Sequence, residues 1–165
     1  MSDIKYCKDR ELDDRLAQSM FELVGESLRH ANSRNNLYDE DTLEAFIGIF
    51  RPDVVKSWLP RDISSHFAFD GDRLIGTAFL GHRDDDAFPD DRTRAYLSGM
   101  YVNPDYQQGY RVGSGLLNSV VDSAKRNGIK TIRAYTTLFP KTMEFYKWNG
   151  FKEISANLKI LKLFI

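Results

Sequence analysis

A glycine-bearing loop that runs into an amphipathic helix is the part of the sequence most able to do chemistry. It spans residues 106–117 and contains Gly109, Gly113 and Gly115. The first backbone N–H groups of a helix have no partner inside the helix, and the helix dipole adds roughly half a positive charge at that end. A phosphate group binds well at such a junction. The loop therefore predicts an anion site built from main chain.

Two further segments flank this loop. Residues 95–102 look like a strand that ends just before Asn103 and Pro104, and an aromatic cluster follows at residues 145–151. Gly99 lies inside the expected strand, where glycine often marks a bulge or the close approach of a ligand. Strand, loop and aromatic cluster together suggest an enzyme that holds a coenzyme by its pyrophosphate.

Hydrophobic spacing predicts the elements that position these residues. Helices are expected over residues 10–29, 39–51, 54–59 and 140–148, with another that follows the loop and stops at residues 125–128. Strands are expected over residues 66–69, 73–80, 95–102, 131–137, 151–154 and 158–165. Residues 32–36 indicate a loop, and Pro52 is expected to interrupt the second helix. The predicted fold class is α/β, an extended sheet with helices on both sides.

The composition excludes several classes of protein. At 165 residues the chain can bury a sizeable core, so we expect one domain over residues 1–165. Its 23 basic and 24 acidic side chains give no global field that would attract nucleic acid. No apolar run approaches the roughly 20 residues that cross a bilayer, and Cys7 is the single cysteine. We expect a soluble, cytoplasmic protein with no membrane partner and no metal site.

These motifs resemble the GNAT superfamily of acyl-coenzyme A dependent N-acyltransferases. The resemblance is densest over residues 97–151, where strand, Val-x-Pro-x-Tyr, glycine loop, helix, strand and Phe-Tyr-x-x-x-Gly-Phe follow in the family's order. It implies a central, mostly antiparallel twisted sheet whose central strands splay apart, flanked by helices on both faces. It also implies an N-acetyltransferase that moves an acetyl group from acetyl-CoA to a primary amine by direct attack in a ternary complex.

The resemblance assigns residues that bind the pyrophosphate. The family motif of Gln or Arg, two residues, Gly, one residue, then Gly or Ala falls on Gln108, Arg111 and Gly113. Arg111 replaces the first glycine, so it must adopt a permitted backbone conformation or turn its guanidinium outward. Main-chain amides along the whole loop are expected to hold the phosphates: Gln108, Gly109, Tyr110, Arg111, Val112, Gly113 and Ser114.

The strand around Gly99 is expected to hold the rest of acetyl-CoA. By resemblance, Gly99 marks the place where the central strands splay, and backbone groups of Met100, Tyr101 and Val102 pair with the pantetheine arm as an added strand would. A backbone N–H near Met100 would also steady the oxyanion of the attacked thioester.

One departure from the family concerns the residues that contact pantetheine. Many relatives carry an asparagine seven residues before the conserved tyrosine, and in this sequence Phe139 stands there. Thr142 or main chain would have to supply the missing contacts.

Tyr146 is the general acid that the resemblance implies. The departing thiolate needs a proton, and a phenol with a pKa near 10 is a neutral donor at pH 7. The amine must lose a proton before attack, so a base is also expected. With Tyr96, Ser98 and Met100 expected to point inward, the sequence leaves the base open among His66, His82 and Tyr135.

The sequence leaves two classes of acceptor open, a small-molecule amine and a peptide amine. Two acidic runs, at residues 84–86 and 90–91, either attract a cationic acceptor or simply form a solvated loop. The apolar residues 158–165 could pair with a second subunit through an uncovered edge, which would make a homodimer.

Two functions other than the enzyme stay open. One is a non-catalytic CoA-binding or regulatory module on the same fold, and the other is an interaction protein that binds no coenzyme.

Overall fold

The computed structural model describes residues 4–59, 63–82, 91–107, 111–135, 140–155 and 160–165. A seven-stranded sheet forms its centre, in the order β1-β2-β3-β4-β5-β7-β6. β4 and β5 pair in parallel, and the other neighbours are antiparallel. The strands are β1 (Ile4–Lys8), β2 (Ser64–Asp70), β3 (Arg73–Gly81), β4 (Arg94–Val102), β5 (Thr131–Tyr135), β6 (Lys152–Ser155) and β7 (Ile160–Phe164).

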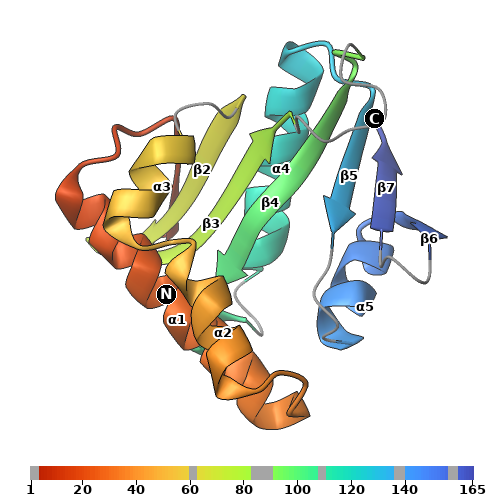
Figure 1. Ribbon diagram of the computed structural model, residues 1–165. Coiled ribbons are helices and arrows are strands. Elements are labelled where there is room, and N and C mark those ends of the chain that lie inside the picture. The colour runs from red at the N-terminus through yellow and green to blue at the C-terminus, as the bar shows by residue number, and fades with distance from the viewer. Residues whose placement is uncertain (1–3, 60–62, 83–90, 108–110, 136–139, 156–159) are drawn as a thin grey trace.

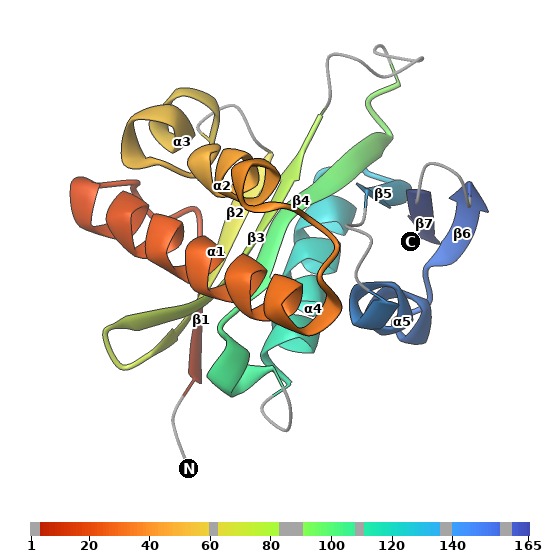
Figure 2. The ribbon, with the colours of Figure 1, turned by 60° about the horizontal axis from the view of Figure 1, so that its bottom comes forward.

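Helices cover both faces of the sheet, as expected. α1 packs against β3 and β4 on one side, while α4 packs against β2, β3 and β4 on the other. Figures 1 and 2 show the sheet between these two layers, with α2 and α3 beside α1. We call the two sides the α1 face and the α4 face. The helices are α1 (Asp14–Asn35), α2 (Glu40–Gly48), α3 (Pro52–Trp58), α4 (Val112–Arg126) and α5 (Pro140–Trp148), with a short 3-10 helix, η2 (Pro104–Tyr106).

The first helix is longer than its sequence indicated. The expected loop over residues 32–36 is wrong, because α1 continues to Asn35 and ends at Asn36, whose φ is +48°. The asparagine side chains are satisfied without breaking the helix: Asn35 Nδ2 donates to the Ala31 carbonyl at 2.8 Å. At the other end, the Asp13 carboxylate accepts a hydrogen bond from Leu16 N at 2.7 Å and caps the first turn.

Two other elements differ from expectation. Pro52 does not interrupt α2, which already ends at Gly48; it opens α3, at a position where a missing N–H does no harm. β1, which includes Cys7, was not expected at all, and it forms an edge of the sheet beside β2.

The last strand is not an edge. β7 lies between β5 and β6 and pairs with both, so the uncovered edge expected over residues 158–165 is wrong. β6 takes the outer position.

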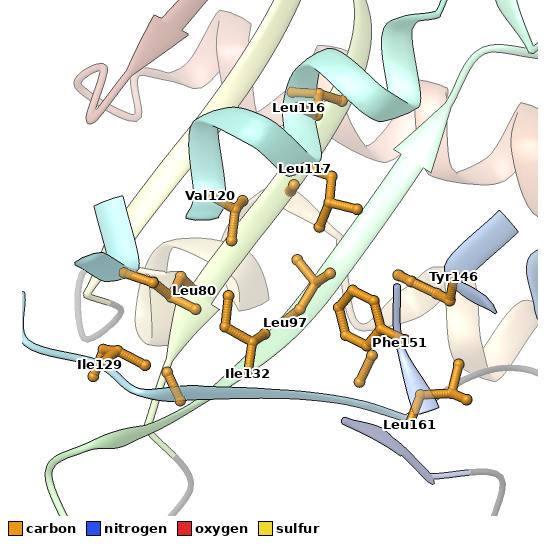
Figure 3. Packing of buried hydrophobic residues seen from close by; sticks show 14 of the residues in the cluster. Leu80, Leu97, Leu116, Leu117, Val120, Ile129, Ile132, Tyr146, Phe151 and Leu161 are labelled. Atoms are coloured by element: carbon orange, nitrogen blue, oxygen red, sulfur yellow. The ribbon is translucent and has the colours of Figure 1, made fainter. Parts of the chain in front are cut away.

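The sheet separates two groups of buried residues. One lies on the α1 face and joins α1, α2 and α3 to β2 and β3, and we call it the α1 cluster. The other, the α4 cluster, joins α4, β4, β5 and α5 on the opposite face. Figure 3 labels ten of its members: Leu80, Leu97, Leu116, Leu117, Val120, Ile129, Ile132, Tyr146, Phe151 and Leu161.

Candidate active site

A bulge at Gly99 sets the geometry of β4. Thr77 of β3 pairs with Tyr101 and Phe79 pairs with Ser98, so β4 has one extra residue between the two pairs. Gly99 has a φ of +56°, in the left-handed region that favours glycine. A Cβ added there would collide with the Phe79 ring. The bulge predicted at this glycine is therefore confirmed.

The extra residue reverses which side chains of β4 face each side. Leu97 belongs to the α4 cluster, and after the bulge Met100 packs on that same side. Tyr101 instead packs with the α1 cluster, on the face that Tyr96 and Ser98 share. The expectation that Met100 points the same way as Tyr96 and Ser98 is therefore wrong, because two residues of β4 oppose one residue of β3.

β4 and β5 separate just before the bulge. The last pair between them that the structure describes is Leu97 with Ala134, while β4 continues beside β3 as far as Val102. Figure 1 shows the two strands diverging toward the end of β4. The splayed central strands expected from the resemblance are present.

The backbone of β4 is only partly available along this separation. The Val102 carbonyl accepts hydrogen bonds from Ser27 Oγ and Gln107 Nε2, both at 2.9 Å. The Val102 carbonyl already accepts these two hydrogen bonds when a ligand pairs with β4. Pairing through Met100 and Tyr101 remains a prediction.

The residue that precedes α4, Arg111, has a backbone conformation that glycine favours. Arg111 stands just before Val112 with φ +54° and ψ +22°, a left-handed backbone, and its side chain is exposed. Its carbonyl accepts the first helical hydrogen bond, from Gly115 N at 3.0 Å. No side chain caps this turn among the residues described. Both options expected for Arg111, a permitted conformation and an outward guanidinium, are met together.

Part of the predicted phosphate loop lies outside the described residues, namely Gln108, Gly109 and Tyr110. Of the remainder, Val112 is buried, while Gly113 and Ser114 are half-buried in the first turn of α4. A Cβ on Gly113 would lie 3.2 Å from the Phe145 ring and 3.7 Å from Met100 Cε. The helix start therefore lies directly against α5 and the bulged part of β4.

Tyr146 lies at the centre of this junction. Its side chain is 6% exposed, and its hydroxyl donates a hydrogen bond to the Met100 sulfur at 3.6 Å. Phe145 and Phe151 pack edge-on against its ring, at centroid distances of 5.4 and 5.1 Å. Burial, and then the nearby Tyr101, raise the pKa of Tyr146 well above its usual range. The phenol therefore keeps its proton at neutral pH.

Thr142 precedes Tyr146 by one turn of α5 and is half-buried. The two side chains therefore lie on the same face of α5. Phe139, which replaces the family's asparagine, lies outside the described residues.

Tyr101, on the α1 face, lies near Tyr146, and Tyr38 lies near Tyr101. Burial and the nearby Tyr38 raise the pKa of Tyr101 to about 12, and the Tyr101 ring meets Phe50 edge-on at 5.4 Å. Tyr38 is held in the turn between α1 and α2 by Asn32, whose side chain bonds both its N–H (3.0 Å) and its carbonyl (2.9 Å). Regular alternation along β4 would place Tyr101 on the α4 face. Only the extra residue at the bulge places it on the α1 face.

Neither of the two histidines among the three candidate bases is placed at the separation of β4 and β5. His66 is fully buried on β2, where its ring nitrogens bond Ser64 Oγ at 2.9 Å and Ser119 Oγ at 2.8 Å. Burial lowers its pKa to about 4. His82 is exposed and follows β3, whose last residue pairs with Tyr96. The side chain of Tyr135 lies outside the description.

Of the two acidic runs, which were expected either to attract a cationic acceptor or to form a solvated loop, the structure describes only Asp91. Asp91 accepts hydrogen bonds from Thr93 Oγ1 at 2.6 Å and Thr93 N at 3.1 Å, and it pairs with Arg94 at 2.8 Å. It is thus engaged with its own strand, and the other acids of the two runs lie outside the described residues. In the described part of the chain, no cluster of His, Cys, Asp or Glu suits a metal ion, and none of the helices is long and apolar enough to span a bilayer.

The fold is shared with solved acetyltransferases. The PaiA N-acetyltransferase of Thermoplasma acidophilum, in complex with coenzyme A, has a TM-score of 0.78 at 23% identity, with 99% of each chain covered. An acetyltransferase from Streptococcus agalactiae has a TM-score of 0.71 at 15% identity, covering 98% of each chain. A GNAT family acetyltransferase from Brucella melitensis, in complex with acetyl-CoA, has a TM-score of 0.65 at 14% identity, covering 100% of this chain and 90% of that one.

Comparison of the sequence itself gives the family. Curated proteins produced no match. The sequence model described as the Acetyltransferase (GNAT) family matches residues 19–151, which is most of the chain and includes the bulge, the start of α4 and Tyr146. The chain therefore belongs to the acetyltransferase (GNAT) family.

Proposed function

We propose that this chain is an acetyl-CoA dependent N-acetyltransferase in which a primary amine, the acceptor, attacks the thioester directly in a ternary complex. One observation carries the proposal: a buried, neutral phenol, Tyr146, lies where β4 and β5 separate and where α4 begins. Solved structures of the same fold contain coenzyme A or acetyl-CoA, which supports acetyl-CoA as the co-substrate.

The residues at the start of α4 fit the phosphates of such a ligand. The left-handed Arg111 leaves the N–H groups of the first turn without a side-chain cap among the described residues, and these groups point out of the helix with the positive end of its dipole. The arginine adds a cation at the same place. Gln108, Gly109 and Tyr110 complete the proposed loop.

The reaction needs two proton movements. The amine nitrogen attacks the thioester carbonyl carbon, a C–N bond forms, and the C–S bond breaks with its electron pair going to sulfur. In this proposal Tyr146 gives its hydroxyl proton to that sulfur, and the acceptor nitrogen loses a proton to water or to a base on the α1 face. The Met100 sulfur, which accepts the Tyr146 hydroxyl, marks the direction in which that proton points.

Replacing Tyr146 by phenylalanine tests this role. The ring and its packing remain, so acetyl-CoA affinity measured by calorimetry should change little, whereas turnover should fall about 10²-fold or more, as loss of a general acid does. Ser57→Ala, which removes an exposed hydroxyl from α3, is the control and should keep full turnover. A Tyr146→Phe enzyme with normal turnover, under conditions where chemistry limits the rate, rules out the acid role.

A second function is favoured by one observation. β4 and β5 contain no carboxylate and no histidine, so neither strand supplies a conventional base at their separation. A CoA-binding or regulatory module without transfer would have the same architecture. Acetyl-CoA binding with no free thiol released across a broad panel of amines would favour that module over the enzyme.

A further inference from the structure

Two consecutive residues of α1 hold two consecutive residues at the end of β4. Ser27 Oγ donates a hydrogen bond to the Val102 carbonyl at 2.9 Å, and the Glu26 carboxylate accepts one from Asn103 Nδ2 at 2.5 Å. Ser27 is 5% exposed and Asn103 is 2% exposed, so each bond has one partner that is shielded from solvent. We call these two hydrogen bonds the α1–β4 contact.

Asn103 fixes the turn from β4 toward the loop that precedes α4. Its backbone N–H donates to the Ile75 carbonyl at 2.8 Å, and its own carbonyl accepts a hydrogen bond from Tyr106 N at 2.9 Å. Its Oδ1 accepts another from Asp105 N at 3.1 Å. With the bond from Nδ2 to Glu26, all four polar atoms of Asn103 have a partner. The direction in which the chain leaves β4 is therefore fixed.

The backbone of Val102 points away from β3, toward the side from which β5 has separated. Val102 pairs with Gly76, so the next residue, Asn103, lies opposite Ile75, to which it donates its N–H. Hydrogen-bonded and non-hydrogen-bonded pairs alternate along an antiparallel ladder, which makes Val102 and Gly76 a non-hydrogen-bonded pair. The N–H and carbonyl of Val102 are therefore directed to the edge that an added strand would use.

The carbonyl of Val102 is held by side chains, and its N–H is the group that remains directed toward the proposed pantetheine arm. The carbonyl has two lone pairs, and it accepts hydrogen bonds from Ser27 Oγ and Gln107 Nε2. Ser27 thereby holds the oxygen of the peptide group whose N–H bonds Ile75. The orientation of this peptide group is fixed at both ends.

The ion pairs around Glu26 are weaker than its bond to Asn103. Arg73 lies 3.8 Å from Glu26 and 3.9 Å from Asp105, and all three side chains are more than half exposed. Exposed pairs of this kind contribute little to stability. The α1–β4 contact therefore depends on hydrogen bonds with buried partners rather than on net charge.

We propose that Ser27 and Asn103 are positioning residues for the coenzyme. They fix Val102 and the turn after it, and so hold two parts of the proposed site at a constant spacing, the edge of β4 for pantetheine and the start of α4 for the pyrophosphate. A ligand that binds at both places gains affinity when this spacing exists beforehand, because less conformational freedom is lost on binding. The inference rests on the proposed function, since it concerns the coenzyme of that reaction.

Calorimetry with coenzyme A and with ADP tests the inference, since ADP has the pyrophosphate and lacks the pantetheine arm. Ser27→Ala should lower the affinity for coenzyme A by about three- to tenfold, as loss of one hydrogen bond does, and should leave the affinity for ADP unchanged. Ser19→Ala is the matched control, because the Ser19 hydroxyl donates to the Arg15 carbonyl within α1. It should bind both ligands as the wild type does.

Asn103→Ala removes the other half of the α1–β4 contact. The affinity for coenzyme A should fall further than in Ser27→Ala, because the turn loses two side-chain hydrogen bonds. Thermal unfolding shows whether each variant is folded at the assay temperature, and Ser27→Ala decides the question if Asn103→Ala does not fold.

Steady-state transfer gives an independent readout. Ser27→Ala should raise the KM for acetyl-CoA and leave kcat unchanged, as loss of binding common to the ground state and the transition state does. Wild-type affinity for coenzyme A in Ser27→Ala, or equal losses for coenzyme A and ADP, overturns the inference even if transfer occurs. A selective loss of coenzyme A affinity in a protein that acetylates no amine would support the inference and overturn the proposed transferase instead, so the two failures are distinguishable.

Discussion

The Thr77 hydroxyl donates a hydrogen bond to the Gly99 carbonyl at 2.8 Å, joining β3 to the bulge of β4. Thr77 is fully buried, so no solvent competes for this bond. The Thr77 side chain of β3 thus donates a hydrogen bond to the carbonyl of Gly99, the residue at which the regular pairing of β3 with β4 is interrupted.

We expect Thr77→Val to lower the free energy of unfolding by about 1–3 kcal/mol, because it leaves a buried carbonyl without its donor. It should also raise the KM for acetyl-CoA, since the bulge places Met100 and Tyr101. Urea unfolding and steady-state kinetics measure the two effects. Thr131→Val is the control: its buried hydroxyl has no hydrogen-bond partner among the described residues, so this variant should be neutral or stabilising. Equal losses in both variants would contradict the assignment.

Gly99→Ala should be among the most destabilising small substitutions in the chain. The new Cβ meets the Phe79 ring at a φ of +56°, so steric overlap and backbone strain add, at about 2–4 kcal/mol together. Gly48→Ala, in α2 with nothing within 4 Å of the new Cβ, should instead stabilise by up to about 1 kcal/mol. Thermal unfolding distinguishes them, and a Gly99→Ala protein as stable as wild type would show that the bulge is absent.

Arg111→Gly should separate stability from coenzyme binding. Glycine accepts the left-handed conformation without strain, so the free energy of unfolding should rise by about 1 kcal/mol. Acetyl-CoA affinity should fall several-fold, because a cation beside the phosphates is lost. Asn36→Gly, at the left-handed end of α1, should change stability slightly and leave affinity unchanged. If Arg111→Gly binds acetyl-CoA as tightly as wild type, the guanidinium takes no part in binding.

Stability should fall on acidification because of His66. Burial lowers its pKa to about 4, below the usual 6.5, so the unfolded chain binds the proton more readily. This contribution is complete above pH 6.5 and is lost as the pH falls toward 4, on the order of 3 kcal/mol in all. Asp9 opposes the shift, and Lys8 and Arg126 add to it. Chemical unfolding of wild type and His66→Gln across this range measures the slope, which the variant should lack; equal slopes would assign it to other groups.

Local patterns predicted α4, α5 and the bulge of β4 well. The spacing of apolar residues and the terminal Lys125, Arg126 and Gly128 gave the end of α4, and α5 has the expected bounds. Gly99 signalled the bulge by its residue type alone. These features depend on neighbours in sequence, which is why the sequence was sufficient for them.

Features that depend on distant pairing were missed. β1 is short, and it is stabilised by β2, some sixty residues away along the chain. The position of β7 inside the sheet follows from its pairing with β5, which no local signal reports. The side of β4 to which Tyr101 points depends on where the ladder slips.

The division of the buried residues between two faces has a consequence for how such a protein changes over time. Substitutions within the α1 cluster reshape the walls around Tyr38 and Tyr101 without touching the packing beneath α4 and α5. If the proposed function holds, a lineage could therefore exchange one amine acceptor for another by altering a single layer, while the opposite layer, against which the thioester carrier would lie, is inherited intact.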